Sequence, residues 1–203
     1  MRQIILASGS PRRKELLELM GLTFTVIPSD FDEWLDDSLD THDVAVALGL
    51  GKARTVAAAN PEAIVIGSDT IVTVDGKQLG KAANDNEARA MLRLLSEHPS
   101  SVTTSVAVIC VAEGYEYASA DTARVVFKPY DETEVEKYIA TQDYRDKAGA
   151  YGIQTGAAPL IDHIAGGITT IIGLPVSLVA AELNKFEITT QPVDYPTRGI
   201  VVQ

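Results

Sequence analysis

The chain has 203 residues, of which 46% are apolar, so it can form one domain with a sizeable core. Seventeen lysines and arginines against 28 aspartates and glutamates give a formal net charge of −11. A chain this acidic is a poor general binder of nucleic acid or of anionic membranes, so neither is expected as a partner.

The first predicted elements are a buried strand and a helix. Residues 4–7 read as the strand, and a turn at residues 8–10 follows. Ser10 suits the N-cap and Pro11 the first position of a helix that ends at Gly21. Further strands, helices and hairpins are predicted at 23–27 (strand), Asp40 or Thr41 to Asn60 (helix), 64–66 (strand) and 71–80 (hairpin).

The second half of the chain contains longer strands. Asn84 and Glu87 resemble a capping box that opens a helix, and the runs at 102–111 and 115–127 form a hairpin through residues 113–114. A helix opened by Asp131 is expected to continue to residue 139. The uncharged run at 164–181 is broken by glycines and Pro175, so it reads as a strand at 168–172 and a helix to Asn184 rather than a membrane span.

This order of elements predicts an α/β protein with a mixed, bent sheet and flanking helices. The expected organisation is a single domain at residues 1–185, which could be two-lobed, and a C-terminal tail at 186–203 with an edge strand near 200–202. The lone cysteine, Cys110, lies in an apolar run and is expected to be a core residue. No leader is visible, and a reducing, cytoplasmic location is expected.

The cations at the start of the first helix indicate a ligand. Arg12, Arg13 and Lys14 fall in the first turn, where the helix macrodipole makes each positive charge unfavourable by ~0.3–1 kcal/mol. Backbone N–H groups, the hydroxyls of Ser8 and Ser10 and the three cations together favour a site for a polyphosphate. The alternative is a solvated basic patch. A serine nucleophile is disfavoured because no histidine base is evident.

Two carboxylates are candidates for chemistry. Asp69 directly follows a predicted buried strand, where open α/β sheets build their sites. It is either a metal ligand or a base that orients water, or else it forms an Asx turn. Glu33, within an acidic loop, is the second candidate, although acidic loops are commonly only solvated.

Three further polar residues have both an ordinary and a functional interpretation. Lys52 lies in line with the apolar stripe of its helix, so it either snorkels or reaches a phosphate. Lys81, at the end of a hairpin, could contact phosphate. Gln154 ends a glycine-containing segment, and its amide can pair in bidentate fashion with the N–H and carbonyl of thymine or uracil.

Four segments resemble the Maf family of nucleotide pyrophosphatases, formerly called septum-formation proteins. They are Leu6-Ala7-Ser8-Gly9-Ser10-Pro11-Arg12-Arg13, Ser68-Asp69-Thr70-Ile71-Val72, Asp146-Lys147-Ala148-Gly149-Ala150-Tyr151-Gly152-Ile153-Gln154 and Gly173-Leu174-Pro175. The likeness covers roughly residues 3–185. It departs at Ala82, where proline is usual, at Glu97, at residues 166–168 and in the tail.

The resemblance implies an inosine triphosphatase (Maf/Ham1)-like fold and a homodimer. It also implies cleavage of a nucleoside triphosphate between its α- and β-phosphates, with Mg²⁺ or Mn²⁺ as the divalent metal. Arg12, Thr70 and Gln154 look like the dTTP/UTP type. Asp69 matches the catalytic proton acceptor, and Glu33, Lys52 and Lys81 match other polar active-site positions; Asp69 and Glu33 are the expected metal ligands.

Two alternatives stay open at this point. One is a pyrophosphatase for another nucleotide, such as CTP, 7-methyl-GTP or a modified base. The other is a non-catalytic nucleotide-binding regulator of cell division, which would keep Arg12 and Arg13 but would have little need of Asp69 and Glu33.

Overall fold

The structure is a computed structural model that describes residues 2–34, 36 and 38–203. The chain forms two compact units. The first unit comprises Met1–Asp69, Thr104–Asp121 and Gly173–Tyr195, and the second comprises Thr70–Thr103, Thr122–Ile172 and Pro196–Gln203. The long strands β6 (Ser100–Cys110) and β7 (Tyr115–Phe127) contribute residues to both units.

The first unit contains three short strands beside β6. β1 (Ile4–Leu6) pairs in parallel with β2 (Thr25–Val26) and with β3 (Ile64–Gly67), and β3 pairs antiparallel with β6. Hydrogen-bonded neighbours follow the order β2-β1-β3-β6-β7-β8-β9, so the sheet is mixed. The predicted α/β class with a mixed sheet and flanking helices is therefore confirmed.

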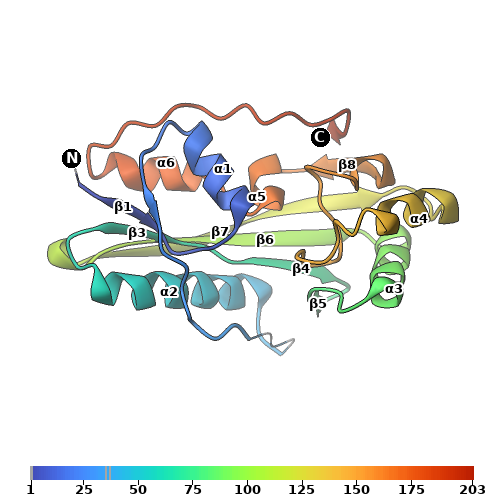
Figure 1. Ribbon diagram of the computed structural model, residues 1–203, viewed down its shortest axis with the longest axis horizontal. Helices are drawn as coiled ribbons and strands as arrows, with labels where there is room; N and C mark the ends of the chain where they lie inside the picture. Colours follow the sequence, from blue (N-terminus) through green and yellow to red (C-terminus); the bar gives the residue numbers. More distant parts are fainter. Residues whose placement is uncertain (1, 35, 37) are drawn as a thin grey trace. The chain divides into compact units, whose positions relative to one another are not determined.

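In the described part of the first unit, the helices are α1 (Pro11–Leu19), α2 (Thr41–Ala59) and α6 (Val176–Asn184). Figure 1 shows α2 along one face of this unit's strands, and α1 and α6 on the other face. Successive strand residues point to opposite faces, and β1 and β3 are apolar and buried along their length, as strands covered by helices on both faces require.

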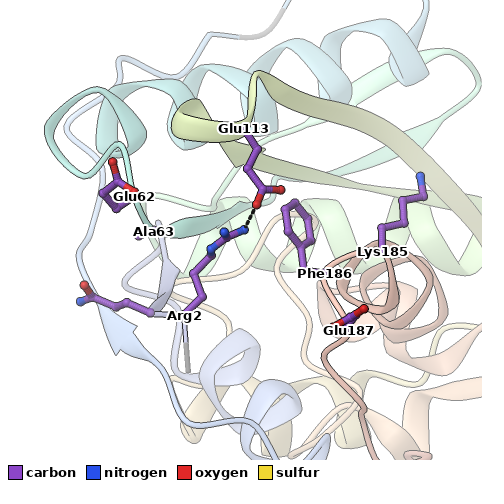
Figure 2. A pocket seen from close by; sticks show the side chains of 8 residues that line it. Arg2, Glu62, Ala63, Glu113, Lys185, Phe186 and Glu187 are labelled. Atoms are coloured by element: carbon purple, nitrogen blue, oxygen red, sulfur yellow. Dashed lines mark ion pairs between the residues drawn. The ribbon is translucent and has the colours of Figure 1, made fainter.

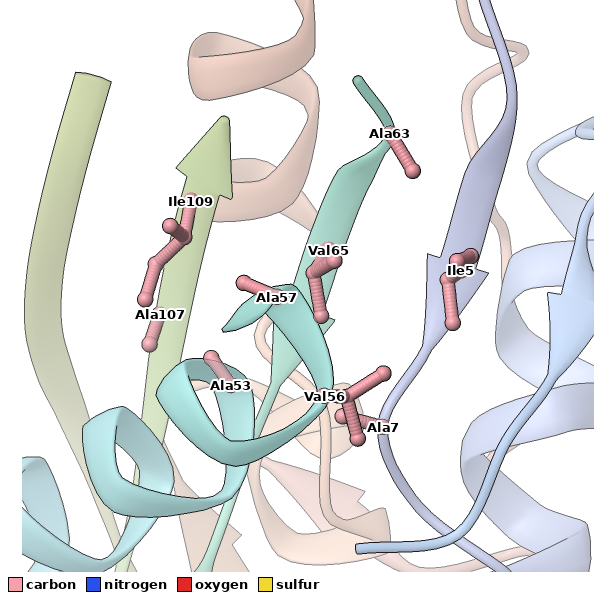
Figure 3. Close-up of a cluster of buried hydrophobic side chains, with 9 residues drawn as sticks. All are labelled: Ile5, Ala7, Ala53, Val56, Ala57, Ala63, Val65, Ala107 and Ile109. Atoms are coloured by element: carbon pink, nitrogen blue, oxygen red, sulfur yellow. The ribbon is translucent and has the colours of Figure 1, made fainter. Parts of the chain in front are cut away.

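Small residues allow α2 to approach the sheet closely. Figure 3 shows Ala53, Val56 and Ala57 of α2 beside side chains of β1, β3 and β6, in a cluster with Ile5, Ala7, Ala63, Val65, Ala107 and Ile109. A Cβ atom on Gly67 would lie 2.3 Å from the carbonyl oxygen of Gly49, so the helix and β3 nearly touch at this point. The end of β3 is thus held against α2.

The second unit begins with a hairpin of β4 (Thr70–Val74) and β5 (Lys77–Leu79). Its turn residues Asp75 and Gly76 have φ angles of 49° and 78°, the left-handed backbone that a tight hairpin turn requires. The other elements of this unit are α3 (Asp85–Glu97), α4 (Glu132–Ala140), a 3₁₀ turn η2 (Ala158–Leu160), β8 (Ile161–Ala165), α5 (Ile168–Ile172) and β9 (Val201–Val202), which pairs in parallel with β8.

One predicted element is wrong. Residues 168–172 form the short helix α5 and not a strand, and the strand of this region is β8, which lies earlier in the chain. Gly166 has a φ of 105°, and the carbonyl of Gly167 accepts hydrogen bonds from the backbone N–H groups of Thr170 and Ile171. A short apolar run has no periodicity that separates a strand from a buried helix, so local backbone geometry decides.

The predicted helix starts are confirmed at three places. The side chains of Asp40, Asn84 and Asp131 each accept a hydrogen bond from a first-turn N–H group. No side-chain capping bond forms at the starts of α1 and α6, where Ser10 and Pro175 occupy the N-cap positions. The β6–β7 turn contains a 3₁₀ segment, η1 (Val111–Glu113), followed by Gly114 with a φ of 60°.

The C-terminal residues are divided between the units: residues up to Tyr195 belong to the first unit, and Pro196–Gln203 belong to the second. In the first unit, Gln191 N–H donates to the Met20 carbonyl at 2.8 Å, and the buried Tyr195 donates its hydroxyl to Glu15 Oε1 at 3.0 Å. In the second unit, β9 lies beside β8 and Ile200 is buried. Among the helices of the described residues, none is long and apolar enough to cross a membrane.

Candidate active site

The turn between β1 and α1 brings Ser8 against the buried Arg13. Arg13 Nη1 donates to Ser8 Oγ at 3.0 Å, and the backbone N–H of Ser10 donates to the same oxygen at 3.3 Å. Burial lowers the pKa of the Arg13 guanidinium, as does the neighbouring Arg12, while the charges of Asp69 and Glu33 oppose this shift. A buried guanidinium at the first turn of a helix is a ready site for an anion.

Arg12 and Lys14 differ from Arg13 in their burial. Arg12 is half-buried, whereas Lys14 is exposed and lies 3.6 Å from Glu18, one helical turn further on. An exposed pair of this kind contributes little to stability. Of the three predicted cations, Arg13 is therefore built into the fold, and Lys14 faces solvent.

The carbonyl of Gly173 connects Arg13 to the end of β3. It accepts one hydrogen bond from Arg13 Nε at 2.9 Å and another from Ser68 Oγ at 3.1 Å. Gly173 has a φ of 121°, which suits glycine, and it directly precedes the segment that leads into α6. Gly173, in the fourth of the motif segments, thus fixes the direction of Arg13 and is hydrogen-bonded to Ser68, the residue before Asp69.

Lys52 links the two predicted carboxylates. Its ammonium Nζ lies 2.5 Å from Asp69 Oδ1 and 2.6 Å from Glu33 Oε1. The side chains of Lys52 and Asp69 are 9% and 12% exposed, whereas that of Glu33 is 55% exposed. Lys52 therefore does not snorkel to solvent, and Asp69 does not merely form a turn: both charges are buried against each other.

The backbone of Asp69 is held by β6. Its N–H donates to Ser105 Oγ at 3.0 Å, and the backbone N–H of Ser105 donates to the Asp69 carbonyl at 2.9 Å. A Cβ atom on Gly49 of α2 would lie 2.3 Å from Ser105 Oγ and 3.5 Å from the Asp69 nitrogen. Glycine is required there, and Asp69 is enclosed by α2, β3 and β6.

Glu33 reaches Lys52 from an irregular segment that has its own anchor. The ring of Phe31 packs on Gly51, where a Cβ atom would lie 2.4 Å from the ring. Ser29 Oγ accepts the N–H of Phe31 at 3.1 Å, which bends the segment before it. Because Gly51 has no side chain, Phe31 can pack against α2, and this contact places Glu33 of the same loop next to Lys52.

The remaining predicted residues belong to the second unit. Thr70 is half-buried and opens β4, Lys81 is exposed, and Gln154 is buried, with 8% of its surface exposed. An isolated antiparallel bridge joins Lys81 to Ala148, and the N–H of Gly149 donates to the Gly80 carbonyl at 3.0 Å. The segment that ends in Gln154 therefore also holds the backbone of Lys81.

Of the predicted site residues, the structure brings together Ser8, Arg13, Glu33, Lys52 and Asp69 within the first unit. Sequence reasoning gave no role to Ser68, Ser105 or the Gly173 carbonyl, which hold these residues in place. One signal was present: residues 103–105 are three consecutive hydroxyl residues inside an apolar strand, and all three are buried. Buried hydroxyls need partners.

The carboxylates of Asp69 and Glu33 fit a divalent cation by their chemistry. Carboxylate oxygens are hard ligands of the kind that suits Mg²⁺ or Mn²⁺, and here one oxygen of each carboxylate contacts the Lys52 ammonium. Within the described ranges, Asp40, His42 and Asp43 also place ligand atoms within 4.8 Å of one another. These three are exposed at the start of α2, where acidic groups commonly serve the helix end.

Two pockets lie elsewhere. Figure 2 shows the first, of about 700 Å³ in the first unit, where Arg2 pairs with Glu113 beside the ring of Phe186. The second, of about 370 Å³ in the second unit, lies between α3, α4 and η2 and includes Phe127 and Leu160. Their lining residues in the described part of the chain include none of the predicted site residues.

Comparison with known proteins assigns the family. The family model described as "Maf-like protein" matches residues 3–186. The chain belongs to the Maf family. Similar relatives named "dTTP/UTP pyrophosphatase" come from Bacillus cereus strain ZK / E33L, at 44% identity, and Bacillus anthracis, at 43% identity. Each alignment spans 188 residues and covers 93% of this chain and 97% of the relative.

A solved structure of a HAM1 protein from Coxiella burnetii is also similar to this Maf protein. It is 17% identical, with a TM-score of 0.42, and the match covers 78% of this chain and 91% of that one. A likeness at this level supports no conclusion about the site.

Proposed function

We propose that this Maf protein is a nucleoside triphosphate pyrophosphatase that hydrolyses dTTP and UTP to the monophosphate and pyrophosphate. The relatives at 43–44% identity are named dTTP/UTP pyrophosphatase, and the alignments cover 97% of their length. The observation that carries the proposal is the joined arrangement of Arg13 and Asp69. The buried Arg13 guanidinium and the Ser68 hydroxyl both donate to the Gly173 carbonyl. Ser68 directly precedes Asp69, whose carboxylate forms the buried ion pair with Lys52.

The cationic part of the site binds the triphosphate in this proposal. Arg13, oriented by Ser8 and Gly173, and the half-buried Arg12 offset the negative charge of the phosphates. Ser10 adds a hydroxyl, and Lys81 a further cation. Because the charge on the departing pyrophosphate increases in the transition state, fixed cations stabilise that state more than the bound substrate.

The carboxylate part of the site supplies the base. Asp69 accepts the proton of the water that attacks the α-phosphorus, and Lys52 orients its carboxylate through the 2.5 Å contact. Glu33 shares Lys52 and, with Asp69, would hold the divalent cation, Mg²⁺ or Mn²⁺, which would supply Lewis-acid polarisation of the phosphate. A non-catalytic nucleotide binder would have no use for two carboxylates on one buried lysine.

Base selectivity falls to Thr70 and Gln154 in this proposal. The Gln154 amide offers one donor and one acceptor, which match O4 and N3–H of thymine and uracil. Cytosine presents the reversed pattern at these two atoms, because it has an amino group where the other two bases have a carbonyl. An amide held in one orientation therefore separates dTTP and UTP from CTP.

The test is a panel of nucleoside triphosphates, incubated with the protein with and without Mg²⁺ or Mn²⁺, with pyrophosphate release as the readout. We expect metal-dependent release that is fastest with dTTP and UTP. Release confined to CTP, 7-methyl-GTP or a modified nucleotide would support the proposed reaction but refute dTTP and UTP as its substrates. Tight nucleotide binding without any release would instead support the regulator of cell division.

A further inference from the structure

Gln154 lies in a tight turn whose backbone is closed by Gly152. The Gly152 carbonyl accepts hydrogen bonds from the N–H groups of Thr155 and Ala157, both at 3.3 Å. Gln154 is buried, although it lies in a connecting segment between α4 and β8. A buried side chain on such a segment keeps one orientation only if the segment itself is fastened.

Asp143 fastens the turn on the side that follows Gln154. The hydroxyl of Thr155 donates to Asp143 Oδ2, and Lys147 Nζ donates to Asp143 Oδ1 at 2.9 Å. Lys147 Nζ also donates to the Asp143 carbonyl and, at 2.8 Å, to Asp146 Oδ1. Both oxygens of Asp143 are thus used, and its side chain is only 20% exposed.

Lys147 and Tyr138 fasten the turn at Gly152, which precedes Gln154, and Tyr138 also fastens it at Gly156, which follows. A Cβ atom on Gly152 would lie 2.5 Å from Cε and 2.8 Å from Cδ of Lys147, so the lysine stem fills the space beside Gly152. The N–H of Gly152 donates to the Tyr138 hydroxyl at 3.1 Å. The Tyr138 ring also packs on Gly156, where a Cβ atom would lie 2.9 Å from Cδ2.

We propose that Asp143, Lys147 and Thr155 form a clamp that positions the Gln154 amide and thereby sets the base selectivity of the enzyme. The clamp rests on the proposed function, since it acts through the base-reading role of Gln154. None of its three members is assigned to the triphosphate or to the attacking water. They are positioning residues, and all three lie in the segment at 141–157 that connects α4 to η2.

The energetic reason lies in the near-symmetry of an amide. Its oxygen and nitrogen are similar in size, so packing alone discriminates poorly between the two flipped orientations, and only one of them matches thymine and uracil. A hydrogen bond to a charged group is among the stronger side-chain contacts. Removal of the Thr155–Asp143 bond frees the residue that follows Gln154, and the incorrect orientation then becomes populated.

The test compares Thr155→Val with Thr155→Ser. Valine keeps the shape of threonine but cannot donate, whereas serine keeps the hydroxyl. We expect Thr155→Val to lower the ratio of kcat/KM for dTTP to kcat/KM for CTP about tenfold, mainly through KM for dTTP. Thr155→Ser should stay within about twofold of wild type. A general loss of folded protein lowers both rates together and leaves this ratio unchanged.

Asp143→Asn provides an independent second variant. It replaces one acceptor oxygen by a donor that faces either the Lys147 ammonium or the Thr155 hydroxyl, so the ratio should fall in the same direction. Equal ratios for Thr155→Val, Asp143→Asn and wild type would refute the clamp. Gln154→Ala, measured beside them, separates the causes: if it alone changes the ratio, base reading stands and the clamp is wrong.

Two results would refute more than the clamp. If Gln154→Ala also leaves the ratio unchanged, the base-reading role of Gln154 is wrong together with the clamp. If wild-type protein releases no pyrophosphate from any triphosphate, the proposed function fails and the clamp fails with it.

Discussion

At the residue scale, the central feature is a lysine between two carboxylates. Lys52 and Asp69 are buried together, and a buried charge pair is costly unless its geometry is good. Hydrophobic residues of similar size would commonly give equal or greater stability at such a place. The pair is therefore better explained by chemistry than by stability, and the same holds for the buried Arg13 at the start of α1.

We expect Asp69→Asn to lower kcat about 10²- to 10⁴-fold, because the amide cannot accept the proton of the attacking water. The fold should be retained, since asparagine has the same shape and Lys52 keeps Glu33 as its anionic partner. The measurement is steady-state pyrophosphate release from dTTP, together with thermal unfolding. Asp75→Asn, in an exposed hairpin turn that asparagine also suits, is the matched control. Near-normal turnover by Asp69→Asn would refute the role of this residue.

The site residues could be predicted from the sequence because each is of a residue type that is unusual at its position in a helix or after a strand. Cations in the first turn of α1, a carboxylate at the end of a buried strand and a lysine on an apolar stripe each conflict with local stability. The roles of Ser68 and the Gly173 carbonyl could not be found in this way, and Ser105 was indicated only by the run of hydroxyl residues at 103–105. A serine is compatible with many environments, and a backbone carbonyl carries no sequence signal.

At the element scale, glycines in α2 decide where the functional side chains lie. Gly49 and Gly51 lie inside a helix of 19 residues, where glycine is unfavourable by ~1 kcal/mol relative to alanine. Gly49 leaves room for the Ser105 hydroxyl, and Gly51 leaves room for the ring of Phe31. Helix stability is thus reduced at two places where the site needs close contact.

This conflict gives a prediction for Gly51→Ala. The new methyl group would lie 2.4 Å from the Phe31 ring, so the ring and the loop that carries Glu33 must shift. We expect kcat/KM for dTTP to fall about tenfold, as small displacements of positioning groups commonly cost that much or more. The unfolding temperature should stay near that of wild type, because helix propensity gains ~1 kcal/mol.

Gly80→Ala is the control for this substitution, because a Cβ atom there meets nothing within 4 Å and its φ is not in the left-handed region. Its kinetics should match those of wild type. Full activity of Gly51→Ala would show that the Phe31 contact does not position Glu33.

Most elements were predictable from their ends. Asp40, Asn84 and Asp131 are capping residues, and Asp75-Gly76 marks a hairpin, so α2, α3, α4 and the β4–β5 pair followed from the sequence. α5 did not, because Ile168–Ile172 is too short and too apolar to show a period. Its conformation depends on the Gly166 backbone, which the sequence leaves open.

At the scale of the whole molecule, the fold divides the motifs between two compact units. Asp69 is the last residue of the first unit's first segment, and Thr70 is the first residue of the second unit. The first unit contains the arginines proposed for phosphate and the carboxylates proposed for water, and the second contains Lys81, also proposed for phosphate, with Gln154 and the loop that holds them. The homodimer that the sequence resemblance implies stays a prediction.

The most direct test of the central claim is hydrolysis of dTTP by the wild-type protein in water enriched in the heavy oxygen isotope. Attack on the α-phosphorus, with Asp69 as the base, places the label in the monophosphate and leaves the released pyrophosphate unlabelled. Mass spectra of the two products distinguish this from other routes. Label in the pyrophosphate, or release of inorganic phosphate with a nucleoside diphosphate, would contradict the account.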